Sequence, residues 1–172
     1  MAEPRFIHLR LHSEFSVTDS VVRIDAAVHR AVRDGMGALA ITDLSNMFGM
    51  TKFYKESRAA GIKPILGADV WITNEADRDK PARLLLLCRS RQGYLNLSKL
   101  LSNAWLTNRH RGRAELRREW FEAHAEGLIA LSGGASGDVG AAVLAGNDAM
   151  ASRLAASWAR SRRTRWKPTS AA

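Results

Sequence analysis

The sequence predicts an α/β fold with about five mostly parallel strands and flanking helices. Short apolar runs alternate along the chain with segments whose apolar residues recur every three or four positions. Two of these runs, residues 38–43 and 83–88, lack the polar alternation of a half-exposed strand, which is typical of parallel strands buried on both faces. Because strands and helical patterns alternate, a parallel sheet with helical crossovers is favoured.

The first two predicted elements are a strand and a helix. Residues 5–12 show the period-two alternation of a strand. Asp19 and Ser20 offer a cap for the helix that follows, and its helical spacing predicts an end at Gly35.

The later elements follow the same alternation. A strand at 38–43 precedes a helix that Ser45 or Asn46 is expected to cap and that ends at Gly61, and a further strand lies within residues 62–72. The remaining elements are a strand at 83–88, a helix through Leu95 and Trp105, a basic loop at 109–113, a short helix near Trp120, a strand at 127–132 and, after Gly133 and Gly134, an Ala-rich helix.

The composition favours a folded protein of the cytoplasm. Apolar residues make up 46% of the 172, which is enough for a hydrophobic core. No apolar run reaches the roughly 18 residues of a membrane span, and the N-terminal residues lack the apolar stretch of a secretion signal. The single cysteine, Cys88, cannot form an internal disulfide, which indicates a reducing compartment.

The net charge of +9 is unevenly distributed. Five of the 26 basic residues lie in residues 159–172, which contain no acid and no apolar periodicity, so residues 1–158 carry only +4. We therefore predict a domain at 1–158 and a basic tail at 159–172 that is disordered. A small basic nucleic-acid-binding protein is one alternative function, because counterion release favours binding of basic surfaces to phosphates.

Candidate site residues lie at the end of the first predicted strand. Side chains at i and i+2 of a strand point the same way, so a His-x-His pair there would bind a metal ion. Arg10 occupies the first of these positions beside His12 and the nearby Asp19, and a guanidinium cannot ligate a cation. His8 and His12 would lie about 13 Å apart, too far to share one ion. For each histidine, hydrogen bonding to backbone or carboxylate is the alternative.

Two further acids are candidates. Asp43 follows the strand at 38–43, where acids are often functional in such folds, although it is equally well placed to cap the next helix. Asp69 lies within an apolar strand and must be paired, bound to a metal ion or exposed, and pairing is the interpretation we favour.

Several segments together resemble one family. They are residues 6–16, 38–43, 52–54, 61–69, 93–97 and 126–133. In this order and spacing they resemble the N-terminal domain of bacterial replicative DNA polymerase III alpha subunits, which is a polymerase and histidinol phosphatase (PHP) domain. The resemblance covers roughly residues 5–158 and implies a truncated portion of a distorted (β/α)7 barrel. The tail does not match the family.

The resemblance also implies a degenerate metal site. Metal-binding members of the family gather ions at the strand ends through a set of histidines and acids. The positions of that set fall here on Arg10, His12, Asp19, Leu44, Asp69 and Arg83. Because Arg10, Leu44 and Arg83 replace ligands, neither a bound metal nor a catalytic residue is expected. Arg10 or Arg83 is instead expected to pair with Asp69, Asp19 or Asp43.

The function implied by the resemblance belongs to DNA replication. The chain would be a fragment of a DNA-directed DNA polymerase, a nucleotidyltransferase, and inactive alone because the Mg²⁺ ions of that reaction belong to the polymerase domain of the parent protein. In the parent, such a domain is a scaffold for the polymerase and its proofreading exonuclease subunit. Other polymerase III subunits are further partners, DNA is bound mainly elsewhere, and no membrane is involved. The alternative enzyme is a residual metal-dependent phosphoesterase or 3′-5′ exonuclease using His12, Asp19 and Asp69.

Overall fold

A computed structural model describes residues 6–160 and 165–167 of the chain. They form an α/β structure that divides into two compact units, residues 1–69 and 70–172. None of the helices in the described ranges is long and apolar enough to cross a membrane.

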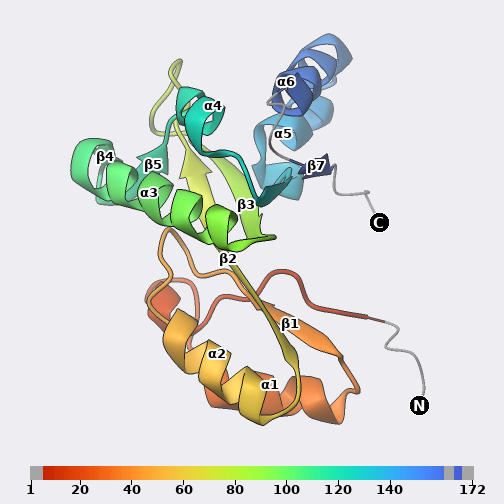
Figure 1. Ribbon diagram of the computed structural model, residues 1–172. Helices are drawn as coiled ribbons and strands as arrows, with labels where there is room; N and C mark the ends of the chain where they lie inside the picture. The colour runs from red at the N-terminus through yellow and green to blue at the C-terminus, as the bar shows by residue number, and fades with distance from the viewer. Residues whose placement is uncertain (1–5, 161–164, 168–172) are drawn as a thin grey trace. The chain divides into compact units, whose positions relative to one another are not determined.

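The first unit is a strand–helix–strand arrangement with one additional helix. Strand β1 (Ala38–Ile41) pairs in parallel with the first part of β2 (Lys63–Ile72). Helices α1 (Ile24–Arg33) and α2 (Met50–Ala59) pack side by side against β1 (Figure 1). The residues of the core between them are Ile24, Val28, Ala31, Leu39, Ile41, Phe53 and Ile62.

The N-terminal segment differs from its prediction. Residues 5–12 do not form the expected strand where the structure describes them, and a short 3-10 helix, η1 (Glu14–Ser16), follows. The segment does run beside β1, where the backbone N–H of Thr42 donates to the carbonyl of Leu11 at 2.8 Å. The N–H of Leu11, however, donates to the hydroxyl of Thr42 at 2.9 Å. A side chain therefore accepts this hydrogen bond, and a regular strand ladder does not form.

The helix ends are confirmed and the helix starts are not. Gly35 and Gly61 follow α1 and α2 with φ of 71° and 74°, the left-handed conformation that glycine adopts without strain. Helix α1 starts after Arg23, beyond the predicted Asp19 and Ser20.

The start of α2 also lies beyond its predicted caps. Helix α2 starts after Gly49 rather than after Ser45 or Asn46. The side-chain oxygen of Asn46 accepts from the N–H of Phe48 at 3.0 Å, so it stabilises a turn before the helix.

The second unit holds the remaining strands and helices. Its strands besides the end of β2 are β3 (Ala82–Cys88), β4 (Arg109–His110), β5 (Arg113–Leu116), β6 (Leu128–Leu131) and β7 (Arg165–Lys167). Its helices are α3 (Arg91–Thr107), α4 (Phe121–His124), α5 (Asp138–Leu144) and α6 (Asp148–Arg160), with short 3-10 turns η2 (Arg118–Trp120) and η3 (Gly134–Ser136).

The sheet is mixed rather than mostly parallel. Strand β2 pairs in parallel with both β1 and β5, and β6 pairs in parallel with β7. Strand β3 pairs antiparallel with β6, and β4 pairs antiparallel with β5. The continuous apolar run of β3 shows only that the strand is buried on both faces. A central antiparallel strand can be buried in the same way as a parallel one, so the run does not predict the strand direction.

Two elements replace predicted irregular segments. The basic loop at 109–113 is the β4–β5 hairpin, turned by Arg111 and Gly112 with φ of 48° and 80°. Of the tail at 159–172, predicted to be disordered, residues 159 and 160 form the end of α6 and residues 165–167 form β7. Backbone pairing to the edge of β6 needs no apolar pattern, which is why the sequence did not reveal it. The rest of the tail lies outside the described residues.

Candidate functional site

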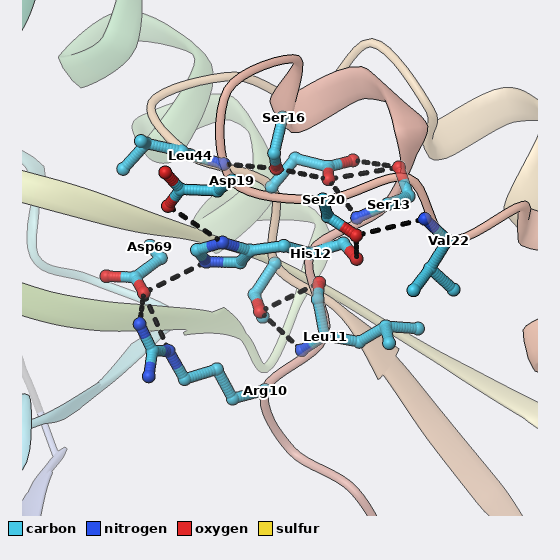
Figure 2. A network of polar contacts seen from close by, with 12 residues as sticks. Arg10, Leu11, His12, Ser13, Ser16, Asp19, Ser20, Val22, Leu44 and Asp69 are labelled. Atoms are coloured by element: carbon cyan, nitrogen blue, oxygen red, sulfur yellow. Dashed lines mark hydrogen bonds and ion pairs between the residues drawn. The ribbon is translucent and has the colours of Figure 1, made fainter.

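The site in the first unit centres on His12, whose ring lies between two carboxylates (Figure 2). Its Nε2 is 3.0 Å from Oδ2 of Asp69, and its Nδ1 is 3.2 Å from Oδ2 of Asp19. A neutral imidazole donates from one nitrogen only, whereas the imidazolium form donates to both acids. The three residues come from the segment before η1, the loop after it and β2.

Arg10 supplies the permanent positive charge. Its Nε and Nη2 both lie 2.7 Å from Oδ2 of Asp69, the same oxygen that contacts His12. The Asp69 side chain is only 3% exposed, whereas that of Arg10 is 60% exposed. The expectation that Arg10 pairs with one of the strand-end acids is confirmed, and the partner is Asp69.

Asp43 forms a second, buried network beside the first. Its carboxylate accepts from the backbone N–H of Ser13 at 2.6 Å and from the hydroxyls of Ser13 and Ser16 at 2.8 and 2.7 Å. The hydroxyl of Ser16 in turn accepts from the N–H of Leu44 at 3.0 Å. Asp43 therefore holds η1 against the end of β1. It does not cap α2, which corrects one of its two interpretations.

The two serines were not identified from the sequence. Ser13 caps the single turn of η1 and Ser16 is its last residue, so both hydroxyls reach the same carboxylate. The spacing of the two serines is visible in the sequence. Their common partner, Asp43, lies 30 residues from Ser13 and 27 residues from Ser16, so no local pattern links them to it.

Backbone hydrogen bonds fix the two acids beside each other. The N–H of Asp69 donates to the carbonyl of Asp43 at 3.1 Å, and the N–H of Ser45 donates to the carbonyl of Asp69 at 2.8 Å. These bonds continue the β1–β2 pairing through a bridge between Leu44 and Asp69. Leu44 is therefore placed at the site by the sheet itself.

An ion pair ties η1 to α2. The ammonium of Lys52 lies 2.8 Å from Oε1 of Glu14. This hydrogen bond, with the nearby positive charge, holds the pKa of Glu14 below its ordinary value.

Arg83 belongs to the second unit. It is buried, and its guanidinium carbon lies 4.3 Å from the ring centroid of Trp71. This geometry is a cation–π contact.

The residues of the first-unit site do not fit a metal ion. Leu44 offers no donor atom, and Oδ2 of Asp69 already contacts Arg10 and His12. Both ring nitrogens of His12 face carboxylates, and the guanidinium of Arg10 adds a positive charge that repels a cation. Within residues 6–160 and 165–167, no three His, Cys, Asp or Glu side chains are grouped so as to hold an ion.

Comparison with known proteins identifies a family and several relatives. A family model described as PHP domain matches residues 8–164. The DNA polymerase III subunit alpha of Neisseria meningitidis is 48% identical over 161 residues, which are 92% of this chain. The subunits named likewise from Pseudomonas aeruginosa and Escherichia coli are each 43% identical, over 89% and 87% of this chain.

These relatives are much longer proteins. The chain spans 13% of the Pseudomonas aeruginosa subunit and 14% of the Neisseria meningitidis subunit. Among solved structures, an amidohydrolase from Chromobacterium violaceum is similar over 57% of this chain and 32% of its own, with a TM-score of 0.46 and 19% identity. That similarity is too distant to carry an argument about this chain.

Proposed function

The chain belongs to the PHP domain family, and from this premise we propose that it is the N-terminal PHP region of a replicative DNA polymerase III alpha subunit. In this proposal the chain is part of a distorted (β/α)7 barrel. Its metal site has been replaced by protein cations, and it acts as a scaffold in the cytoplasm. The contact between Arg10 and Asp69 is the observation that carries the proposal.

The Arg10–Asp69 pair supports the loss of a metal. A buried carboxylate needs a positive partner or several hydrogen bonds, because its transfer from water is costly. Arg10 and His12 supply both to Asp69, and the serine network supplies hydrogen bonds to Asp43. The acids at these strand ends are thus stabilised by side chains of the chain itself.

The scaffold role rests on the relatives. Polymerases transfer nucleotides with metal ions held by carboxylates, and we assign the Mg²⁺ of that reaction to another domain of the parent protein. We propose the proofreading exonuclease subunit and other polymerase III subunits as partners of this region. DNA would be bound mainly by the remainder of the parent.

A metal-binding experiment tests the first half of the proposal. The purified chain is stripped with chelator, dialysed against zinc or manganese and analysed for bound metal. We expect far less than one ion per chain. The matched variant carries Arg10→His and Leu44→His, which restore two ligand side chains within the first unit. One tightly bound ion per wild-type chain would contradict the proposal.

A binding experiment tests the second half. The chain is mixed with the proofreading exonuclease subunit of the same organism, and co-elution is measured by size-exclusion chromatography. We expect a complex, and the fold of the unbound chain is checked by circular dichroism. A folded chain that does not bind would contradict the scaffold role and leave the metal result unaffected.

A further inference from the structure

Helix α3 buries one side against the sheet of the second unit and leaves the other side exposed. It packs against β3, β5 and β6 (Figure 1), and its buried residues include Leu97, Leu100 and Ala104. Residues three or four positions apart lie on the same side of a helix. The exposed residues at such spacings, which we call the α3 face, are Arg91, Leu95, Lys99, Ser102, Trp105 and Leu106.

Three large apolar side chains of the α3 face reach solvent. Leu95 is 42% exposed, Trp105 is 41% exposed and Leu106 is 82% exposed. Spacings of four, three and four residues separate Leu95, Lys99, Ser102 and Leu106. One α-helix packs along another with this repeat, so the pattern indicates a helix as the partner.

The segment that contains α3 is strongly basic. Residues 80–114 include eight Lys and Arg residues and no Asp or Glu. Some of these cations are paired with acids outside the segment, as Lys80 is with Asp77 and Arg111 is with Asp79. Such pairs compensate the positive charge at the edge of the segment and not along the helix.

The cations on and beside the α3 face have no such acids. Arg91 and Lys99 are exposed on the face, and Arg109 is exposed just beyond the end of α3. Among the described residues, none of these three forms an ion pair. Positive charge therefore lies at both ends and in the middle of the apolar stripe.

Charge and apolar pattern together select the occupant. Leucines of an acidic helix would pack against Leu95 and Leu106, and its carboxylates would pair with Lys99 between them. A second copy of the chain is disfavoured, because two α3 faces in contact would bring like charges together. Nucleic acid is disfavoured, because contacts to phosphates would leave the two leucines exposed.

We propose that the α3 face docks an acidic amphipathic helix of a partner protein. From Arg91 to Leu106 the face is about 22 Å long at the helical rise of about 1.5 Å per residue, which matches about four turns of a partner helix. The inference uses only residues of the second unit and does not rest on the polymerase assignment. Its experiments use synthetic peptides, so their failure is distinct from a failure to bind the exonuclease subunit.

The first experiment tests the chemistry of the partner. The acidic probe is a peptide of three heptads with leucine at positions a and d and glutamate at e and g, where like charges keep it from pairing with itself. One control peptide has lysine in place of glutamate, and another has serine in place of leucine. A single-stranded oligothymidine of about 20 nucleotides represents nucleic acid.

Binding of each labelled probe to the full 172-residue chain is measured by fluorescence anisotropy. We expect the acidic peptide to bind at least about tenfold more tightly than each of the other three probes. Equal binding of the serine peptide would reduce the interaction to general charge attraction and overturn the proposal. Equal or tighter binding of the oligothymidine, or no binding of the acidic peptide, would overturn it as well.

The second experiment locates the apolar contact. Leu106→Ser removes an exposed leucine of the α3 face, and Leu144→Ser removes one that is 73% exposed on α5. Affinity for the acidic peptide should fall at least about fivefold in the first variant and stay unchanged in the second. Equal effects of the two substitutions would overturn the location. A dimer of the wild-type chain in sedimentation that Leu106→Ser abolishes would assign the face to a second copy instead.

The third experiment reverses the charge preference. Lys99→Glu places an acid in the middle of the α3 face, and Lys55→Glu makes the same change at an exposed lysine of α2. The measured quantity is the ratio of the affinities for the acidic and the lysine peptide, which a change in stability alone does not alter. We expect this ratio to fall at least about tenfold in Lys99→Glu and to change less than about twofold in Lys55→Glu. Equal changes in both variants would show that net charge decides the binding and would overturn the proposal.

Discussion

The two units bury acidic side chains in different ways. In the first unit, the carboxylate of Asp43 accepts from a backbone N–H and two hydroxyls, and Asp69 contacts Arg10 and His12. In the second unit, the fully buried Glu115 lies among cations, with Arg78 at 3.1 Å and Arg113 at 3.5 Å.

The buried acids of the two units also differ in how completely they are hydrogen-bonded. Among the described residues, Oε1 of Glu115 and the Nε atoms of Arg78 and Arg113 have no hydrogen-bond partner. The negative charge of Glu115 is therefore balanced by two arginines, but one of its carboxylate oxygens accepts no hydrogen bond from the described residues. The carboxylate of Asp43, in contrast, accepts several hydrogen bonds, including some from the hydroxyls of two serines. Loss of an acid should therefore cost more where more donors are left without an acceptor.

Asp43→Ala is expected to have the largest effect. It leaves the N–H of Ser13 and the hydroxyls of Ser13 and Ser16 buried without their acceptor, and we expect a loss of about 3 to 4 kcal/mol in the free energy of unfolding. Denaturant titration measures it. The control is Asp34→Ala, which removes an exposed pair with Arg30 and should cost about 0.5 kcal/mol. Equal losses would show that the serine network adds little stability.

Asp69→Ala is expected to have the next largest effect, and it should lower the free energy of unfolding more than Arg10→Ala does. Removing Asp69 leaves His12 and Arg10 without their shared acceptor, with an expected loss of about 2 to 3 kcal/mol. Arg10→Ala should cost only about 1 kcal/mol, because the exposed guanidinium gains little from the pair and His12 still contacts Asp69. Denaturant titrations of both variants and of the double variant give the coupling. Additive losses would contradict a direct Arg10–Asp69 interaction.

Glu115→Gln should be milder. The amide oxygen still accepts from Arg78, and the two arginines reach solvent with side chains that are 35% and 28% exposed. We expect a loss of about 1 kcal/mol. A loss as large as that of Asp43→Ala, measured under the same conditions, would show that charge balance outweighs hydrogen bonding in the second unit.

The smallest effect is a pH dependence at the surface of the first unit. The pKa of Glu14 is lowered in the folded chain by Lys52, so this pair stabilises the fold above the ordinary value of 4.5. That contribution is lost as the pH falls from 4.5 through the lower folded value. Lys52→Met should therefore lose less stability than the wild type in this window. Lys55→Met, at an exposed lysine of the same helix, should follow the wild type.

Most helix and strand positions could be predicted because they depend on local pattern. Gly35 and Gly61 end their helices as expected, and the apolar runs that include β1 and β3 lie where predicted. Elements defined by long-range pairing could not be predicted in this way. The two-residue strand β4 is too short to show a period, and β7 depends on the open edge of β6.

Position at the strand ends marked Arg10, His12, Asp43 and Asp69 as candidates, but the pairing of an arginine with these acids was expected only from the resemblance to a family. Arg10 and Asp69 are 59 residues apart, and no local spacing relates them. Their positions in the family motifs led to the hypothesis that Arg10 and Asp69 pair, and in the structure the two side chains are in contact. Ser13 and Ser16 had no counterpart in that reasoning, because hydroxyls that bind an acid leave no distinctive signal in a single sequence.

The backbone bonds between Asp43, Asp69 and Ser45 have a consequence for motion. The backbones of Asp43 and Asp69 lie in the extension of the β1–β2 pairing, so neither of these two acids can move independently of that strand pair. The site opens only when the strand pair opens, as one cooperative unit. Native-state hydrogen exchange at the amides of Asp69 and Ser45 should therefore report the same opening free energy as the amides within β1.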